Sequence, residues 1–340
     1  MSSPSPLSPL PQPSSVPETF LDATLRPVAW NEYIGQPQIK ENLRILLSAA
    51  KGRGQAPEHL LFYGPAGLGK TTLAHLIAKE LGANMKITSG PAVERVGDLA
   101  SILTNLSAGD ILFIDEIHRL NKNIEEVLYP AMESGRLDII IGKGPSARTV
   151  QLELPPFTLI AATTRIALLS SPLRSRFSGG VFRLAFYTAG EIVQIIKRSS
   201  SILGVETDDE ALFEIACRSR HTPRTANYLL KRARDFAQVN NVPLSKQVVE
   251  KAFRLLGVDS VGLTPLDHKL LSVIIDNFGG GPVGLTTIAA SLSEDPATIE
   301  DVSEPFLMQL GFIERTPRGR VVTQKGYEHL GLEQEQKRLL

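Results

Sequence analysis

The sequence predicts an α/β fold: a doubly wound parallel sheet, followed by a small helical domain and a winged helix. From about residue 18 to residue 187, short β-rich runs alternate with helical ones, beginning with HLLFYG and then TTLAHLIAKELG. Strand and helix alternating in this way imply parallel strands joined by crossover helices. The strand pattern stops after the tract SGGVFRLAFY, so we expect the sheet to be confined to this first region.

The remainder of the chain has helical periodicity and ends in a hairpin pattern. The expected helices lie between Gly, Thr-Pro and Asn-rich breaks, at 188–204, 207–219, 223–240, 245–257, 265–278, 285–292 and 296–310. The last helix is followed by FIERTPRGRVVT, whose Thr-Pro-Arg-Gly centre suits a tight turn between two strands. Three helices and a β-hairpin predict a winged helix.

The chain is too long for one hydrophobic core. Its 340 residues exceed the size at which a single core stops growing. We expect a large domain at 18–187, a helical domain at 188–260 and a winged helix at 261–340. Residues 1–17 are almost entirely Ser, Pro and Leu, a composition that predicts a disordered tail.

Composition narrows the class of protein. A hydrophobic content of 42% and a charged content of 21% are those of an ordinary globular protein. The formal net charge is zero, so nucleic-acid binding would need a local basic patch. The single cysteine excludes an internal disulfide. No secretory signal is present and no apolar run reaches the roughly 18 residues of a membrane span, so we expect a cytoplasmic protein.

The strongest motif is GPAGLGKT at residues 64–71, which fits the P-loop pattern between a strand and a helix. Its glycines let backbone N–H groups surround phosphate oxygens, and the helix N-terminus adds a favourable dipole. Lys70 is expected to reach the β and γ phosphates of ATP, and the hydroxyl of Thr71 to ligate Mg²⁺. The alternative is a glycine-rich turn that only packs.

Two carboxylates follow a buried strand. The apolar run ILFI leads directly into Asp115 and Glu116, at the carboxyl end of a parallel strand, where ligands bind in such sheets. We assign Asp115 to the Mg²⁺ shell and Glu116 to polarising the attacking water. The alternative is a solvated turn. His118 and Arg119 come next, and either a coupling role or a surface role is open for them.

Two further segments supply polar groups for the same chemistry. The strand FTLIAATT ends at Thr163 and Thr164, of which Thr164 is the better candidate for the γ-phosphate or the water. The segment SPLRSRF contains Arg174 and Arg176. An exposed arginine there could act on a neighbouring subunit's nucleotide, a contribution worth about 10³–10⁵ in rate; an ordinary salt bridge is the alternative.

In this order and spacing, the P-loop, DEIHRL, ATTR and PLRSRF resemble the AAA+ ATPases. Longer blocks resemble one family among them, the RuvB family of branch-migration helicases, over about residues 20–332. These blocks are LRPVAWNEYIGQ, YGPAGLGKTTLA, LFIDEIHRLN, EEVLYPAMESGRLDIIIGKGPSAR, LPPFTLIAATTR, TPRTANYLLKRARDFA and FIERTPRGR. The resemblance implies an AAA+ P-loop sheet, a helical lid and a winged-helix DNA-binding domain.

The resemblance also implies roles for individual residues. Arg176 would be the arginine finger and Arg224 the sensor-2 arginine of the lid. The residues implied on the adenine side are Leu25, Arg26 and Tyr187. Those implied around phosphates and magnesium are Gly67, Lys70, Thr71 and Thr72. Those implied to approach nucleotide across a subunit boundary are Glu133, Ser134 and Gly135.

The tract from Leu137 to Leu154 reads as a β-hairpin inserted in the ATPase core, with Ile139 and Ile141 among its aliphatic side chains. By resemblance this hairpin docks on a RuvA-like junction-binding protein, whereas an aliphatic hairpin alone is more often simply packed. The family further implies a hexameric ring on duplex DNA at Holliday junctions, with a RuvC-like resolvase as a further partner.

The C-terminal hairpin carries a basic cluster on a neutral chain. Arg315, Arg318, Arg320 and Lys325 have only Glu314 opposing them in the sequence. Such a cluster suits sequence-independent phosphate contacts, and by resemblance Arg315 and Arg320 touch DNA. A solvated turn is the alternative.

The sequence therefore predicts an ATP-hydrolysing DNA motor for Holliday junction branch migration in recombination and repair. One rival is a clamp-loader-like ATPase that remodels a protein ring, which the winged helix disfavours. A second rival is a nucleotide-regulated DNA-binding module without turnover, which the presence of both Glu116 and Arg176 disfavours.

Overall fold

The computed structural model describes residues 20–141 and 148–333. The predicted tail at 1–17 lies outside these residues. The described chain forms two compact units. The ATPase unit contains Arg26–Gly64 and Leu68–Ala185, and the C-terminal unit contains the chain from Phe186 onward with Pro65–Gly67 and the short helix α1 (Phe20–Leu25).

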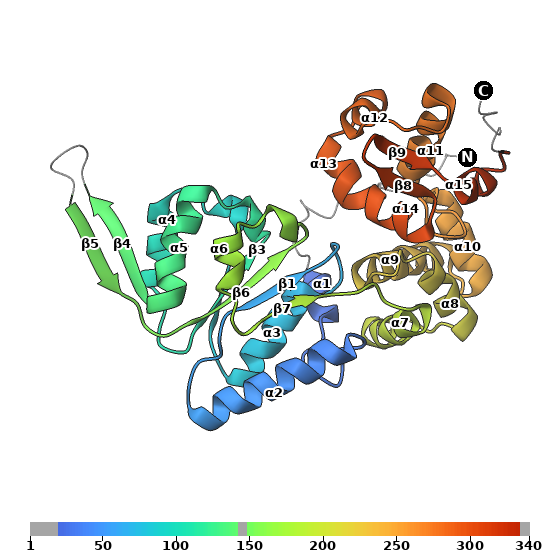
Figure 1. The fold of residues 1–340 in the computed structure, drawn as a ribbon. Helices are drawn as coiled ribbons and strands as arrows, with labels where there is room; N and C mark the ends of the chain where they lie inside the picture. The colour runs from blue at the N-terminus through green and yellow to red at the C-terminus, as the bar shows by residue number, and fades with distance from the viewer. Residues whose placement is uncertain (1–19, 142–147, 334–340) are drawn as a thin grey trace. The chain divides into compact units, whose positions relative to one another are not determined.

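A five-stranded sheet forms the centre of the ATPase unit, in the order β2-β3-β6-β1-β7 (Figure 1). Its strands are β1 (Leu60–Tyr63), β2 (Met85–Ser89), β3 (Ile111–Asp115), β6 (Thr158–Thr163) and β7 (Gly180–Arg183). Every neighbouring pair is parallel. The predicted doubly wound parallel sheet is confirmed.

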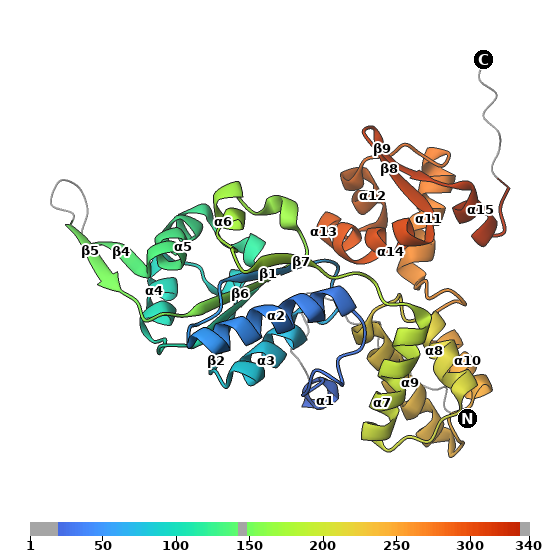
Figure 2. The ribbon, with the colours of Figure 1, turned by 60° about the horizontal axis from the view of Figure 1, so that its bottom comes forward.

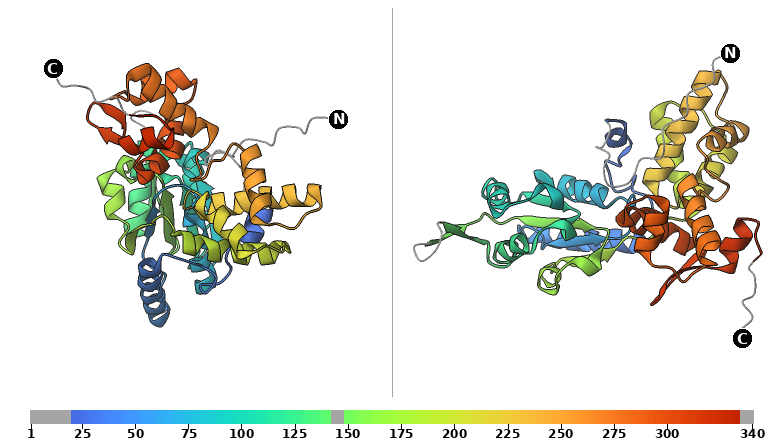
Figure 3. Two further views of the ribbon diagram at one scale, coloured as in Figure 1. Left: turned by 90° about the vertical axis from the view of Figure 1, so that its right-hand side faces the viewer. Right: turned by 90° about the horizontal axis from the view of Figure 1, so that it is seen from above.

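Helices cover both faces of this sheet (Figures 1 and 3). The α-helices are α2 (Pro37–Arg53), α3 (Lys70–Leu81), α4 (Val96–Thr104), α5 (Lys122–Ser134) and α6 (Ser171–Ser175). The short 3-10 turns are η1 (Gly90–Ala92), η2 (Ile117–Arg119) and η4 (Ile166–Leu168). Successive strand residues face opposite sides, so Leu61, Leu112 and Leu159 join the core under α4 and α5. Their neighbours Leu60, Phe62 and Phe113, equally buried, face the side of α2 and α3.

The predicted inserted hairpin is confirmed. Strands β4 (Arg136–Ile141) and β5 (Arg148–Glu153) pair antiparallel and project away from the central sheet (Figure 2). Leu137 at its base is fully buried in the core beneath α5. The side chains of Ile139 and Ile141, at which we expect a partner to dock, lie outside the described residues.

The C-terminal unit begins with the predicted helical domain. Its helices are α7 (Ala189–Leu203), α8 (Asp209–Cys217), α9 (Pro223–Asn240) and α10 (Lys246–Leu255). Each start follows a side chain of the type that caps helices: Thr188, Asp208, Thr222 and Ser245. The first three accept a hydrogen bond from a backbone N–H of the first turn, which satisfies a group that the helix itself cannot.

The winged helix follows, with its own core around Leu271, Ile274 and Leu307. Its elements are α11 (Pro265–Phe278), α12 (Leu285–Leu292), α13 (Pro296–Thr298), the π-turn η5 (Ile299–Ser303), α14 (Glu304–Leu310), β8 (Ile313–Thr316), β9 (Gly319–Val322) and α15 (Gln324–His329). The predicted helix at 296–310 is therefore interrupted by a π-turn, and α15 was not expected. Within residues 20–141 and 148–333, every helix is too short or too polar to traverse a lipid bilayer.

Candidate active site

The P-loop has the conformation that its glycines allow. Gly64, Gly67 and Gly69 have φ of 140°, 80° and 94°, in the region that other residues adopt only under strain. A Cβ atom on Gly64 would lie 2.7 Å from the carbonyl oxygen of Leu184, so a side chain would not fit. Helix α3 begins directly at Lys70, which aims the helix N-terminus at the loop and makes it a site for a phosphate group.

Lys70 and the first turn of α3 are placed for phosphate binding. The side chain of Lys70 is 7% exposed, and its Nζ donates a 2.8 Å hydrogen bond to the carbonyl oxygen of Gly64. The ammonium group is therefore held over the loop that phosphates would enter. Thr71 and Thr72 follow in the first helical turn and are half-buried.

The predicted carboxylates lie at the carboxyl end of the sheet. Asp115 is the last residue of β3, and the N–H of Glu116 donates to its Oδ1 at 3.0 Å. Glu116 has φ of 47°, a left-handed conformation that is costly for a residue with a Cβ and that clusters at functional sites. This turn directs the Glu116 side chain toward the end of β6.

Thr164 contacts Glu116 directly. Its backbone N–H and its hydroxyl donate to Oε2 of Glu116 at 3.2 Å and 3.1 Å. Nδ1 of His118 lies 3.1 Å from the same carboxylate oxygen and 2.9 Å from the hydroxyl of Thr163. The site thus contains a Glu–Thr–His cluster, in which the His118 side chain is largely buried.

The charge state of Glu116 follows from this cluster. Burial raises the pKa of Glu116, but the hydrogen bond with His118, the positive charge of Lys70 and the N–H of Thr164 together lower it below its ordinary value. Glu116 is therefore ionised at neutral pH. An anionic carboxylate can accept a proton or orient a water molecule.

Arg176 lies beside another predicted residue, Glu133. Its Nη2 donates to Oε2 of Glu133 at 2.9 Å, and its Nη1 donates to the carbonyl oxygen of Pro172 at 2.7 Å. Glu133 stands in the last turn of α5, with Ser134 ending the helix and Gly135 capping it at φ of 63°. The structure therefore brings the predicted finger and the predicted 133–135 segment to one surface of the ATPase unit.

A polar network beneath Arg176 was missed by sequence reasoning. The guanidinium carbon of Arg176 lies 4.7 Å from the centre of the Tyr129 ring. The hydroxyl of Tyr129 is 3.1 Å from Oε2 of Glu125 and 2.8 Å from Oγ of Ser170, and Ser170 donates to that same Glu125 oxygen at 2.6 Å. Glu125 and Tyr129 are four residues apart on α5, the spacing that could have signalled a shared face.

Four predicted nucleotide ligands belong to the C-terminal unit. The backbone N–H of Arg224, in the first turn of α9, donates to the carbonyl oxygen of Gly67 at 3.4 Å. A Cβ on Gly67 would lie 3.1 Å from Cβ of Arg224, so this approach requires a glycine. Leu25 and Tyr187 are each 3% exposed, and Leu25 accepts a hydrogen bond from Arg198 of α7. Arg26, in the ATPase unit, directly follows α1 and is half-buried.

The basic wing differs from expectation, because its arginines have acidic partners within the same domain. Arg320 is 9% exposed, and its Nε and Nη2 donate to the two carboxylate oxygens of Glu304 at 2.8 Å and 3.0 Å. Arg315, opposite Arg320 on the paired strand, lies 3.4 Å from Glu300 and has a side chain 54% exposed. Glu300 and Glu304 come from a helical segment earlier in the chain, so the local sequence around the wing did not reveal them.

This arrangement separates the wing cations into two kinds. Arg315, Arg318 and Lys325 are exposed and are available to a phosphate backbone. Arg320 is committed to a buried ion pair, and a DNA contact by its guanidinium would require it to exchange partners. DNA contact by Arg315 and Arg320 stays a prediction.

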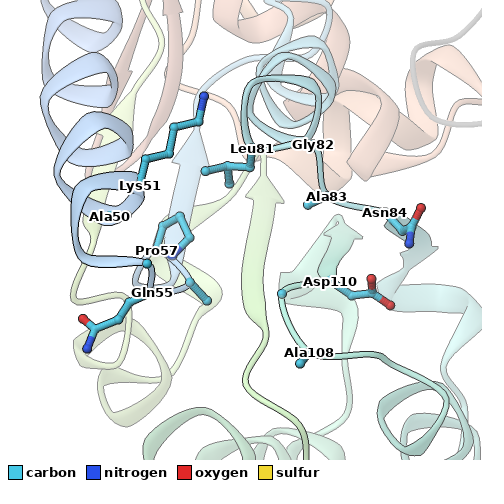
Figure 4. Close-up of a pocket in the computed structure, with 13 residues that line it drawn as sticks. Ala50, Lys51, Gln55, Pro57, Leu81, Gly82, Ala83, Asn84, Ala108 and Asp110 are labelled. Atoms are coloured by element: carbon cyan, nitrogen blue, oxygen red, sulfur yellow. The ribbon is translucent and has the colours of Figure 1, made fainter.

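A pocket of about 350 Å³ in the ATPase unit lies away from this chemistry. It is lined by the end of α2, the end of α3 and the loop before β3, including Lys51, Asn84 and Asp110 (Figure 4). These segments precede the strands of the sheet, whereas the P-loop and Glu116 follow them. The pocket is therefore at the opposite edge of the sheet from the active site.

Family comparisons cover the chain in three successive parts. Residues 25–184 match the "Holliday junction DNA helicase RuvB P-loop domain", residues 187–259 the "RuvB AAA lid domain", and residues 260–331 the "RuvB C-terminal winged helix domain". The chain belongs to the RuvB family. It is a AAA+ ATPase with a nucleotide-binding P-loop, as the sequence predicted.

Similar proteins and solved structures support the same family assignment. The Holliday junction branch migration complex subunit RuvB of Dehalococcoides mccartyi (strain CBDB1) is 59% identical over 313 residues, which are 92% of this chain and 89% of the relative. The solved Thermotoga maritima RuvB, described as a Holliday junction branch migration motor, is 49% identical, with a TM-score of 0.84 over 91% of this chain and 99% of that one. A mutant of the same Thermotoga protein matches with a TM-score of 0.85.

The first prediction separates binding from turnover in this RuvB-family site. We expect Lys70→Ala to abolish nucleotide binding, because it removes the ammonium group over the P-loop. Glu116→Gln should keep binding and slow hydrolysis by at least about 10²-fold, since an amide cannot accept a proton. Fluorescent-nucleotide binding and phosphate release would be measured for both. Hydrolysis by Glu116→Gln at the parental rate would refute the role given to this carboxylate.

The second prediction concerns the wing. Arg320→Ala leaves Glu304 buried without its partner and should destabilise the winged helix by about 3–5 kcal/mol. Arg315→Ala breaks an exposed pair and should cost less than about 1 kcal/mol. Calorimetric unfolding of the full chain would compare them.

A double replacement identifies the cause of the loss. Arg320→Leu combined with Glu304→Leu removes both buried charges and should recover much of the lost stability. If Arg320→Ala were as stable as Arg315→Ala, the ion pair would not be the buried constraint that the geometry indicates.

Proposed function

We propose that this chain is the ATP-driven motor that moves Holliday junctions in recombination and DNA repair. The observation that supports it most directly is the convergence of the P-loop, Asp115, Glu116 and Thr164 at one edge of the sheet, in a RuvB-family chain that also carries a winged helix. We also propose the roles of individual residues, the assembly and the partners.

ATP with Mg²⁺ is the proposed cofactor pair. The glycine conformations of the P-loop, the buried ammonium of Lys70 and the carboxylate of Asp115 suit a phosphate chain and a hard cation with oxygen ligands. Thr71 and Asp115 are the proposed magnesium ligands, and Thr72 and Gly67 line the phosphates. When bound, Mg²⁺ supplies charge neutralisation at the phosphates. Glu116, held by Thr164 and His118, orients the attacking water and accepts its proton.

The adenine side is assigned to Leu25, Arg26 and Tyr187, and a phosphate contact to Arg224. Two buried apolar side chains suit the faces of a purine ring. Arg224 stands in the first turn of α9, beside Gly67, where a guanidinium and the helix N-terminus both favour an anion. A lid helix that touches the P-loop in this way can respond to the nucleotide state.

Arg176 is proposed to act in trans, on nucleotide held by a neighbouring subunit of a ring, together with Glu133, Ser134 and Gly135. Three features support this assignment. Arg176 directly follows α6, and its side chain is 26% exposed. Its Nε is buried without a hydrogen-bond partner among the described residues, and unsatisfied buried donors call for an explanation. The ring of Tyr129 packs against the guanidinium group of Arg176.

The proposed assembly is a hexameric ring on duplex DNA, with a RuvA-like protein on the β4–β5 hairpin and a RuvC-like resolvase as a further partner. The exposed wing cations Arg315, Arg318 and Lys325 would bind phosphates without reading bases. Arg320 supports the wing through Glu304 and is proposed to join DNA only by exchanging that partner. The domain division at 18–187, 188–260 and 261–340 suits these separate tasks.

A four-way junction tests the proposed function. The full chain with ATP, Mg²⁺ and RuvA should convert a synthetic junction into two duplexes, and it should do so weakly without RuvA. Glu116→Gln should be inactive in the same assay, whereas it should still bind the junction. ATPase activity that is indifferent to duplex DNA, with no junction conversion, would favour the clamp-loader-like rival; junction binding without any ATPase would favour the non-enzymatic one.

A mixing experiment tests action in trans. Arg176→Ala and Lys70→Ala subunits are each expected to be inactive, but mixed rings should recover part of the ATPase activity, because each supplies what the other lacks at some boundaries. Tyr129→Ala, which removes the support beneath Arg176, should be weakly active alone and should also gain activity when mixed with Lys70→Ala.

One outcome of the mixing experiment would contradict action in trans. Mixed rings that form, as shown by size and light scattering, but recover no activity would mean that Arg176 acts in its own subunit or is structural. Tyr129→Phe serves as the matched control, because it keeps the ring beneath the guanidinium and removes only the hydroxyl. It should retain more activity than Tyr129→Ala.

A further inference from the structure

A carboxylate that precedes the winged helix and two imidazoles within that domain converge at one place. Asp259 lies in the loop between α10 and α11, His268 lies on α11, and His329 is the last residue of α15. Nε2 of His268 is 2.9 Å from Oδ2 of Asp259, and Nε2 of His329 is 2.7 Å from the same oxygen. Three segments far apart in sequence therefore direct three ligand atoms at one point.

The cluster is held in place by its surroundings. The other oxygen of Asp259, Oδ1, accepts hydrogen bonds from the N–H groups of Val261 and Leu263 at 3.0 Å and 2.8 Å, which fix the carboxylate plane. The ring of Phe312 stacks on His329 with centroids 4.7 Å apart. Outer contacts of this kind orient ligands in metal sites.

The cluster is accessible to an ion. The side chains of Asp259, His268 and His329 are 20%, 36% and 18% exposed, so they are neither sealed in the core nor freely mobile on the surface. All three ligand atoms lie within 4.8 Å of one another. Within the described residues, this is the group of His and acidic side chains with the spacing of a metal site.

The donor set selects the class of metal. Two imidazole nitrogens and one carboxylate oxygen, with a fourth position open to water, form a ligand set that Zn²⁺ uses. Mg²⁺ prefers oxygen ligands and keeps much of its water, so the magnesium of the ATPase reaction should not compete strongly here. Coordination needs the Nε2 lone pair, and each neutral ring can provide it by carrying its proton on Nδ1.

We propose that Asp259, His268 and His329 form a Zn²⁺ site. The ion takes the place now occupied by the two N–H···O contacts and binds all three side chains at once. Asp259 precedes the winged helix, whereas His268 and His329 belong to its first and last helices. The ion therefore links the segment that precedes this domain to the first and last helices of the domain. We expect Zn²⁺ binding to stabilise the folded domain.

The test uses the full chain in excess Mg²⁺, with Zn²⁺ and then Co²⁺ as probes. We expect one Zn²⁺ to bind per chain, and Co²⁺ to give the visible absorption of a four-coordinate site. Thermal unfolding of the C-terminal unit should shift upward with Zn²⁺, because a ligand that prefers the folded state stabilises it.

Three variants assign the ligands. Asp259→Asn keeps an Oδ1 acceptor for the backbone N–H groups, His268→Gln changes the most exposed member, and His329→Gln changes the most enclosed one. Each should weaken Zn²⁺ binding by at least about 10–100-fold, the loss typical of disturbing even an outer contact of a metal site. Asp276→Asn, an exposed acid on the same helix α11, is the matched control and should bind Zn²⁺ like the parent.

The proposal stands or falls on this comparison, independently of branch migration. Equal Zn²⁺ affinity in the parent and in His268→Gln, or no Zn²⁺ binding by the parent, would show that the cluster is only a hydrogen-bonded part of the fold. If His329→Gln does not fold by circular dichroism, His268→Gln decides, because its side chain can be replaced with the least disturbance.

Discussion

The register of β1, β3 and β6 is the constraint on which the active site depends. Tyr63 pairs with Thr163, and Ile114 pairs with Ala161, so the three strands end at nearly the same level. The loops that follow therefore present the P-loop, Glu116 and Thr164 at one edge. Every residue of β6 is buried, so its side chains pack against neighbours on both faces of the sheet. Packing of α3 and α5 on the two faces thus fixes the distances that the chemistry requires.

The residues that could be predicted from the sequence are those identified by a pattern of a few consecutive residues. The P-loop spelling, the apolar strand before Asp115 and the hairpin around Pro317 each need only neighbouring residues to be recognised. The partners of charged side chains could not be predicted in the same way. Arg320 and Glu304 come from a strand and from a preceding helix, and the sequence shows their charges but not their shared burial. The same holds for Arg176 with Glu133, for His118 with Glu116, and for Asp259 with its two histidines.

Left-handed backbone conformations occur at Glu116, which follows β3, and at two residues that precede α9. Glu116 has φ of 47°, and the consecutive residues Arg220 and His221 both have φ of 54°. Glycine enters that region without cost, whereas a residue with a Cβ does not. Here Nδ1 of His221 lies 3.0 Å from the carbonyl oxygen of Tyr187, whose N–H donates back to the carbonyl of His221. These contacts offset strain of order 1–3 kcal/mol per residue and hold the segment before Arg224 in one conformation.

Four of the side chains proposed to act on nucleotide or DNA already have partners within their own unit. Lys70 donates to Gly64, Glu116 accepts from Thr164, Arg176 pairs with Glu133, and Arg320 pairs with Glu304. Nucleotide or DNA binding must therefore exchange contacts and not simply add them, so the net gain is smaller than the new contacts alone would give. The exchange is least costly for the exposed pair, Arg176 with Glu133, and most costly for the buried one, Arg320 with Glu304. The Arg176–Glu133 pair is therefore suited to the exchange that the proposed role in trans requires, whereas Arg320 is better suited to holding the wing in shape. The exposed Arg315 and Arg318 remain the better candidates for the proposed phosphate contacts.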